Sequence, residues 1–391
     1  MRGFFTGAVS VIIIGLIAGC VLLLSGLILA NADAKSSGLE LRAANTPLKA
    51  TMRKEAPNGL NPVELSNASL SEGTADTGGS DMKVVNRIAA GGEGGWDYVS
   101  IDQTARKLYI SRGATIMSVD ADTGKSTLGL ATTNRSHQVI PINGGAELLV
   151  TNSGDATITI VNATTGRTRL RTHVSAGPDA ALLEPTTGLV AVIGNQSGNV
   201  DLIDPKSGAS KGSIAVGGTL EYAAADGKGK VFVNVEDKAE MAAIDIKARQ
   251  VIVRYKLTGC KKPTGLAYLA PNNLLLTACG NGIAELVSPG TGTVVQSLKI
   301  GKGSDAVFYD AVRKLAFISS GESGTLAVIA VEGQTARVVE TLKTAKGARL
   351  GMVDTKTGKV YLPIAKFGPP KTVGGWPTVL PGSFEILVVG R

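Results

Sequence analysis

The chain has 391 residues, of which 43% are hydrophobic, only 18% are charged and 50 are glycine. This composition excludes a large helical protein, which would need more Leu, Glu and Lys, and it indicates many short strands joined by tight turns. The net charge of +8 fits a polyanion-binding surface or an ordinary basic protein, and the two histidines and three cysteines argue against a metal enzyme. We expect no cofactor.

An apolar run follows Met1 and Arg2 and ends in the A-x-A pattern Ala30-Asn31-Ala32. Residues 1–32 are therefore predicted to be a cleaved signal peptide or an uncleaved membrane anchor. A third interpretation is a lipoprotein box at Ile17 to Cys20, although apolar residues follow it. Each alternative places the rest of the chain outside the cytoplasm, in the periplasm or the extracellular space. Only an uncleaved or lipidated segment would attach it to a membrane.

Residues 33–81 are poor in large apolar side chains and rich in Ser, Asn, Ala, Gly and Thr. Such a stretch cannot bury enough surface to offset the entropy of ordering it. We predict a flexible linker.

From residue 82 to residue 391 the chain repeats with a period of about 41 residues, and four strands per unit at this period are typical of propeller blades. Each unit opens with a Gly-x-Asp-like step and an apolar strand, and it closes with a turn such as Asp120-Ala121-Asp122-Thr123-Gly124-Lys125 before its fourth strand. Seven units can be counted. The sequence therefore predicts an all-β, seven-bladed β-propeller of four-stranded blades.

The seventh unit provides only three strands of its own. The segment Lys83 to Ile88 precedes the first unit and resembles the fourth strands elsewhere, such as Val294 to Ile300. We expect this N-terminal strand to complete the last blade and close the ring. The alternatives are an open β-solenoid or a two-sheet sandwich.

The second strands of the units carry a resemblance to a known repeat. Leu149-Val150-Thr151-Asn152, Tyr109-Ile110-Ser111-Arg112 and Phe232-Val233-Asn234-Val235 resemble the YVTN β-propeller repeat, although no unit keeps the full Tyr-Val-Thr-Asn. The resemblance covers residues 82–391 and implies a bacterial periplasmic or surface propeller. It is specific for fold and does not name an activity, since related propellers include surface-layer, DNA-binding and lactonase-like proteins and the propeller domains of copper and haem reductases.

Propeller ligands usually bind over the central channel, so we expect the binding residues in the loops that enter the innermost strands and follow the second strands. Four carboxylates occupy equivalent steps in four units and should form part of a ring at the channel mouth. His137 and Arg349 take the same step in the second and seventh units and break the symmetry. The candidate binding residues are Trp96, Asp97, Arg112, His137, Asp179, Glu221, Asp305, Arg349, Lys366, Phe367 and Trp376.

The four ring carboxylates also form the one candidate metal site. Asp97, Asp179, Glu221 and Asp305 offer the oxygen ligands that Ca²⁺ prefers. The alternative is that each carboxylate caps backbone N–H groups of its own turn. We favour capping and predict no metal, because a repeated position implies a repeated structural task.

Two further features distinguish single units. The seventh unit carries an insertion from residue 366 to about residue 382, which should project over the channel face or pack as a lid. Cys260 and Cys279 lie toward the same end of the first two strands of the fifth unit, and they are a possible disulfide in an oxidising compartment.

No motif for nucleophilic catalysis, phosphate binding or haem attachment occurs in the sequence. The residues favour a non-enzymatic, monomeric binding scaffold that contacts a protein, a polysaccharide or a nucleic acid of the cell envelope. The alternative is a metal-dependent, lactonase-like hydrolase with its carboxylates at the channel mouth. A propeller subunit of a redox complex would lack cofactor ligands of its own.

Overall fold

The computed structural model describes residues 81–370 and 377–391. The predicted signal peptide or anchor and residues 33–80 of the predicted linker lie outside the described residues. Within these residues, no helix is both long enough and apolar enough to cross a membrane.

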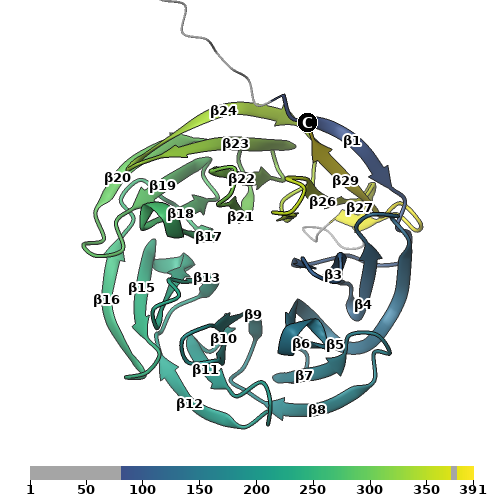
Figure 1. Cartoon of the computed structure of the whole chain (residues 1–391), viewed down its shortest axis with the longest axis horizontal. Coiled ribbons are helices and arrows are strands. Elements are labelled where there is room, and N and C mark those ends of the chain that lie inside the picture. Colours follow the sequence, from purple (N-terminus) through teal and green to yellow (C-terminus); the bar gives the residue numbers. More distant parts are fainter. Residues whose placement is uncertain (1–80, 371–376) are drawn as a thin grey trace, which may run out of the picture. The chain divides into compact units, whose positions relative to one another are not determined.

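Short segments rich in Val, Ile, Leu and Ala form antiparallel sheets that are arranged around a central opening (Figure 1). Four sheets have four consecutive strands. Their members are β9 (Pro178–Glu184), β10 (Leu189–Gly194), β11 (Asn199–Ile203) and β12 (Ser210–Ala215); β13 (Leu220–Ala225), β14 (Lys230–Val235), β15 (Glu240–Asp245) and β16 (Gln250–Lys256); β17 (Pro263–Leu269), β18 (Leu274–Cys279), β19 (Ile283–Val287) and β20 (Val294–Lys299); and β21 (Ser304–Asp310), β22 (Leu315–Ser320), β23 (Thr325–Glu332) and β24 (Thr335–Lys343).

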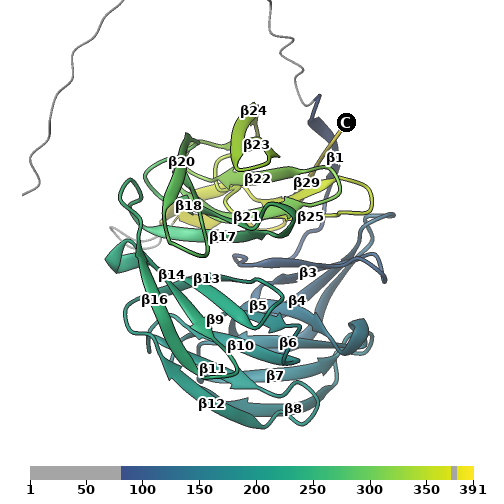
Figure 2. The ribbon, with the colours of Figure 1, turned by 60° about the vertical axis from the view of Figure 1, so that its left-hand side comes forward.

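A fifth four-stranded sheet joins the two ends of the described chain. Its order is β1 (Lys83–Ile88), β29 (Glu385–Gly390), β26 (Val360–Ile364) and β25 (Met352–Val353). The strand β1 pairs antiparallel with β29 from Lys83 opposite Gly390 to Ile88 opposite Ile386. The segment singled out in the sequence is therefore a strand, and it lies at the outer edge beside the last strand of the chain (Figures 1 and 2).

The first two predicted units share one seven-stranded sheet. It contains β2 (Val99–Asp102), β3 (Lys107–Ser111), β4 (Gly113–Asp120), β5 (Ser126–Ile142), β6 (Glu147–Asn152), β7 (Thr157–Asn162) and β8 (Thr168–His173). The 17-residue strand β5 leaves the outer edge of one unit and becomes the inner strand of the next. Glycines occur in the corresponding connections elsewhere, but residues 131–136 have none and include two β-branched threonines, which favour extended backbone.

The core lies between neighbouring sheets. In the sheet of β9 to β12, β10 and β11 are almost wholly buried, whereas β12 is largely exposed. Middle strands thus carry continuous apolar runs because both of their faces pack against other sheets. The remaining elements are a small hairpin of β27 (Phe367–Pro370) and β28 (Pro377–Val379) and the 3₁₀ turns η1 (Asn143–Gly145), η2 (Glu236–Lys238) and η3 (Ala270–Asn272).

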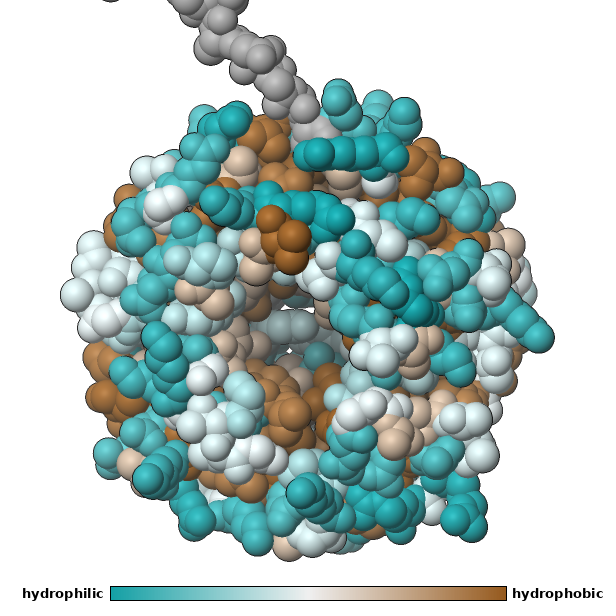
Figure 3. All heavy atoms as spheres, in the orientation of Figure 1, coloured by the Kyte–Doolittle hydropathy of each residue, from teal (hydrophilic) through white to brown (hydrophobic). Residues whose placement is uncertain are grey.

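The prediction of an all-β chain built from four-stranded antiparallel sheets in a β-propeller architecture is confirmed. Helical structure in the described residues is limited to the three 3₁₀ turns. The sheets leave the centre of the molecule hollow, and hydrophobic residues gather along part of the opening (Figure 3).

Candidate functional site at the channel mouth

A β-bulge at the start of several inner strands sets the direction of the predicted ring residues. His137 and Gln138 lie between the pairs Ser136–Asn152 and Val139–Val150, so two residues oppose one on β6. The same shift occurs at Asp179 in β9 and at Glu221 in β13. A bulge bends the strand and re-aims the side chain of the extra residue, which is why bulges are frequent at binding sites.

Polar side chains of the second strands hold these bulges in place. The hydroxyl of Thr151 donates to the carbonyl oxygen of Asp179 at 2.7 Å, and that of Ser319 donates to the carbonyl oxygen of Arg349 at 2.7 Å. The first bond reaches the inner strand β9 of the next sheet, and the second reaches the segment that leads into β25. The third position of the YVTN-like segments is therefore polar because it fixes the backbone of a ring residue across a sheet-to-sheet boundary.

The ring residues of the first three units form a compact group. The Nδ1 atom of His137 lies 2.6 Å from Asp97 Oδ2 and 2.9 Å from Asp179 Oδ1. The other ring nitrogen, Nε2, lies 2.9 Å from the hydroxyl of Ser153, and the hydroxyl of Tyr98 donates to Asp179 Oδ2 at 3.2 Å. The histidine is thus held between two carboxylates and oriented by a serine.

The two carboxylates keep the imidazole charged. Burial disfavours the imidazolium, but its hydrogen bonds to the carboxylates of Asp179 and Asp97 raise the pKa of His137 from 6.5 to about 10. Burial also raises the pKa of Asp97, against the hydrogen bond from His137. At neutral pH the side chain of His137 is therefore an imidazolium, and both carboxyl groups lie against its Nδ1 atom.

The other two ring carboxylates are less well compensated. Burial, followed by the charges of Asp179 and Asp305, raises the pKa of Glu221 to about 9. Its carboxylate accepts a hydrogen bond of 2.9 Å from the neutral amide of Asn195. Burial raises the pKa of Asp305 to about 6 despite the guanidinium of Arg349, whose Nε donates to Asp305 Oδ2 at 2.7 Å.

One group in the described residues has the composition of a metal site. It consists of Asp97, His137 and Asp179, with one potential ligand atom from each lying within 4.8 Å of the others. The set expected from the sequence was different, because it contained Glu221 and Asp305 and lacked the histidine. In the structure the Nδ1 atom of His137 is engaged by both carboxylates, so a metal ion would have to displace its proton.

Arg112 and Trp96 are buried beneath the mouth, so they do not offer the exposed side chains that a binding role predicts. The guanidinium of Arg112 donates to four backbone carbonyls, those of Gly91, Glu93, Gly94 and Gly95, at 2.9 to 3.1 Å. It also lies 3.8 Å from the centre of the Phe384 ring. Arg112 therefore holds the loop that leads into β2.

The insertion of the last unit forms the hairpin of β27 and β28. Phe367 remains 40% exposed, and its ring centre lies 6.0 Å from that of Trp96. Lys366 is exposed at the start of the hairpin. Trp376 lies outside the described residues.

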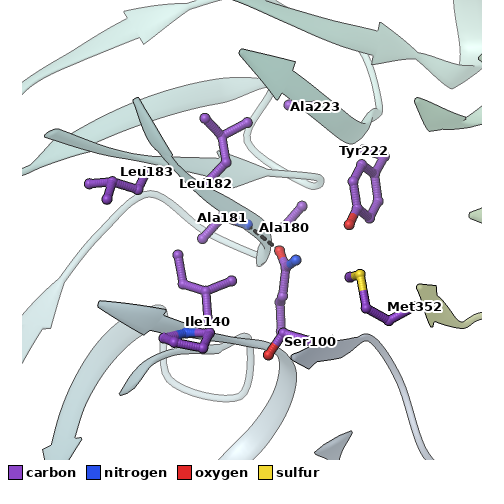
Figure 4. A pocket seen from close by; sticks show the side chains of 11 residues that line it. Ser100, Ile140, Ala180, Ala181, Leu182, Leu183, Tyr222, Ala223 and Met352 are labelled. Carbon is purple, nitrogen blue, oxygen red and sulfur yellow. Dashed lines mark hydrogen bonds between the residues drawn. The ribbon is translucent and has the colours of Figure 1, made fainter. Parts of the chain in front are cut away.

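An apolar pocket of about 240 Å³ is lined by residues of the inner strands β2, β5, β9, β13 and β25. Its wall includes Gln138, Ala180 and Tyr222, each of which directly follows a ring residue, and it continues along β9 to Leu183. Figure 4 shows Tyr222, Met352, Ile140 and Leu182 around this space. This pocket and the tyrosines beside it were not predicted from the sequence. The signal that could have indicated them is the aromatic residue that follows the acid in both Asp97-Tyr98 and Glu221-Tyr222.

Cys260 and Cys279 form a disulfide with a Cα–Cα distance of 5.4 Å. Cys279 pairs with Pro263 across β17 and β18, so Cys260 approaches it from the loop before β17. The disulfide ties this loop to the end of β18.

Comparisons with known proteins agree on the architecture. Residues 81–234 match the family model described as outer membrane protein assembly factor BamB. A chain of the crystal structure of the mitotic checkpoint complex is 13% identical with a TM-score of 0.60, over 82% of this chain and 96% of that chain. A chain of Kuenenia stuttgartiensis hydrazine synthase is 14% identical with a TM-score of 0.62, over 74% of this chain and 96% of that chain.

At such low identity these structures establish the fold alone. A search of curated proteins finds no match. The YVTN resemblance stays a prediction. The chain is therefore similar to BamB-like and other propeller-like proteins, and its function has to be argued from its own site.

Proposed function

We propose that this chain is a non-enzymatic binding scaffold of the cell envelope that holds a cationic group of its ligand at the channel mouth. The observation that carries the proposal is the charge imbalance of the ring. Among the described residues, four carboxyl groups of the ring face two cationic side chains, and Glu221, whose pKa is raised to about 9, keeps its proton at neutral pH with an amide as its hydrogen-bond donor. A bound cation would supply the missing positive charge and allow Glu221 to ionise.

The proposed architecture is a ring of seven blades that is closed by β1. Seven inner strands support this count, namely β2, the second half of β5, β9, β13, β17, β21 and β25. The pairing of β1 with β29 supports closure, because the first and last strands then belong to one sheet. A closed ring of blades would position the six ring residues, Asp97, His137, Asp179, Glu221, Asp305 and Arg349, around a single channel.

The envelope location rests on three observations. The matching family is described as an outer membrane assembly factor, residues 1–32 have the pattern of an export segment, and Cys260 and Cys279 form a disulfide. Disulfides persist mainly in oxidising compartments. Protein, polysaccharide and nucleic acid remain the partner classes that the sequence predicts, and the acidic mouth favours a partner with a basic group over a polyanion there.

A metal-dependent hydrolase is the second candidate, and the group of Asp97, His137 and Asp179 is the observation that favours it. A metal would polarise a bound carbonyl or activate water. The scaffold is preferred because an imidazolium with a pKa of about 10 is a poor metal ligand.

Thermal unfolding of the full-length protein with a panel of cations tests the proposal. A ligand at a hundred times its dissociation constant stabilises the folded state by about 2.7 kcal/mol, which is a measurable shift. We expect at least one class among divalent metals, amines, guanidinium compounds and basic peptides to stabilise the wild type and to lose its effect in Asp179→Asn/Glu221→Gln. If no class does so, the proposed function is wrong. Stabilisation by a metal together with lactone hydrolysis would favour the second candidate.

A further inference from the structure

The acidic ring and the apolar pocket are built from consecutive residues of the same inner strands. Asp179 belongs to the ring, and the next residues of β9, Ala180 to Leu183, line the pocket. The pairs His137–Gln138 and Glu221–Tyr222 repeat this arrangement on β5 and β13. The inner strands β5, β9 and β13 are neighbours. Their charged residues therefore lie side by side at the beginning of the strands, and their apolar residues lie side by side farther along.

Two tyrosines stand between the charged and apolar parts. The rings of Tyr98 and Tyr222 meet edge to face with their centres 5.3 Å apart. The hydroxyl of Tyr98 donates a hydrogen bond to Asp179 of the acidic ring, and Tyr222 lines the pocket. Aromatic faces attract cations and pack well against hydrocarbon, so this pair suits a ligand that changes from polar to apolar along its length.

The charges of the ring are close enough to act on one ligand group. Asp97 and Asp179 lie 2.6 and 2.9 Å from the same nitrogen of His137, and the charges of Asp179 and Asp305 contribute to the raised pKa of Glu221. Two of the described ring residues, His137 and Arg349, are cationic. Both already pair with carboxylates of the ring. The ring can therefore accept a further positive charge.

We propose that the channel binds a linear aliphatic primary amine, with its ammonium group among the ring carboxylates and its hydrocarbon chain in the apolar pocket. This inference rests on the function proposed above and names its ligand class. The pocket of about 240 Å³ corresponds to the liquid volume of about eight water molecules. Its length, the three residue steps from Ala180 to Leu183, is about 10 Å. Both dimensions suit a chain of about six carbon atoms with one terminal nitrogen.

Other cations fit only half of this arrangement. A divalent metal would use the carboxylates and leave the pocket unfilled, since hard cations seek oxygen ligands. An unsubstituted guanidinium ion would pair with the carboxylates, but it is broader than an ammonium group, planar, and has no hydrocarbon chain to place in the pocket. Of these three cations, the alkylamine is the one that is complementary to both the charged and the apolar surfaces.

Calorimetric titration of the full-length protein with propylamine, butylamine, pentylamine and hexylamine tests the inference. Each methylene group that enters the pocket should tighten binding about fourfold, as expected for burial of hydrocarbon. Hexanol, which lacks the charge, should bind at least tenfold more weakly than hexylamine. Binding near neutral pH should also release protons, because the ammonium group lowers the raised pKa of Glu221.

Two variants separate the parts of the site. Glu221→Gln should weaken all four amines by a similar factor of about ten, whereas Ala180→Leu should fill the pocket and abolish the gain with chain length. Glu332→Gln and Ala248→Leu change exposed residues and are the matched controls. If Ala180→Leu does not fold, Met352→Phe at the same pocket replaces it. Equal affinity for all four amines, or affinity unchanged in both site variants, overturns the inference.

The outcomes distinguish the two proposals. If Ca²⁺ or a guanidinium compound binds in a way that depends on Glu221 but hexylamine does not bind, the proposed amine ligand is wrong and the proposal of a cation-binding scaffold stands. Absence of all cation binding would overturn both.

Discussion

Replacing Glu221 by Gln should make the folded protein more stable. In the wild type the carboxyl group of Glu221 keeps its proton up to about pH 9 in the folded state, whereas its ordinary pKa is 4.5. The side chain of Gln is neutral at every pH and retains the oxygen that accepts from Asn195. The substitution therefore removes a cost that the ligand site imposes on the fold.

The magnitude follows from the proton balance. At about 1.4 kcal/mol for each pH unit above 4.5, holding this proton costs the folded wild type about 3 kcal/mol at pH 7. Glu221 is half-buried, so solvent reduces this figure and we expect a gain of about 2 kcal/mol. The raised pKa fixes the direction of the pH dependence. The stability that protonated Glu221 contributes is fully present below pH 4.5 and is lost as the pH rises through about 9. The advantage of the variant should thus be absent near pH 4 and grow toward pH 9.

Equilibrium denaturation in urea at a series of pH values, followed by tryptophan fluorescence, measures this difference. Glu332→Gln, at an exposed position, should give no such pH-dependent difference. A Glu221→Gln protein that is less stable than the wild type at pH 7, or whose advantage does not change with pH, would refute the assignment of a neutral carboxyl group at this position.

Three further substitutions probe the supports of the site. His137→Asn should lower the free energy of unfolding by about 2 kcal/mol at pH 6. This loss should shrink as the pH rises from 6.5 through about 10, where the imidazolium loses its proton, and a loss that does not change over this range in urea denaturation would contradict the ion pair. Arg112→Lys should cost about 3 kcal/mol, because an ammonium group cannot reach the four carbonyls that the guanidinium binds, and an unchanged melting temperature would exclude this role. Cys260→Ser should cost about 3 kcal/mol for the loop of 19 residues, but only without reductant, and equal losses with and without dithiothreitol would argue against the disulfide.

Repetition made the fold predictable. The regular spacing of apolar segments and Asp-Thr-Gly turns indicates four-stranded units, and the displaced segment Lys83 to Ile88 is the strand β1 as expected. The same regularity predicted that Asp97, Asp179, Glu221 and Asp305 would occupy equivalent steps. It failed at β5, where residues 131–136 contain no glycine and one strand continues from the outer edge of the first unit into the second.

The sequence alone determined the strand pattern, the turn chemistry and the positions of the ring residues, because these depend on local backbone preferences and on a short repeat. Only the tertiary structure decided what those residues contact. His137 meets Asp97 and Asp179 across separate inner strands, Arg112 is buried under the Gly91–Gly95 loop, and the pocket exists between strands that are more than a hundred residues apart. Such contacts and the pKa values that follow from them depend on distances between sheets, which no local pattern contains.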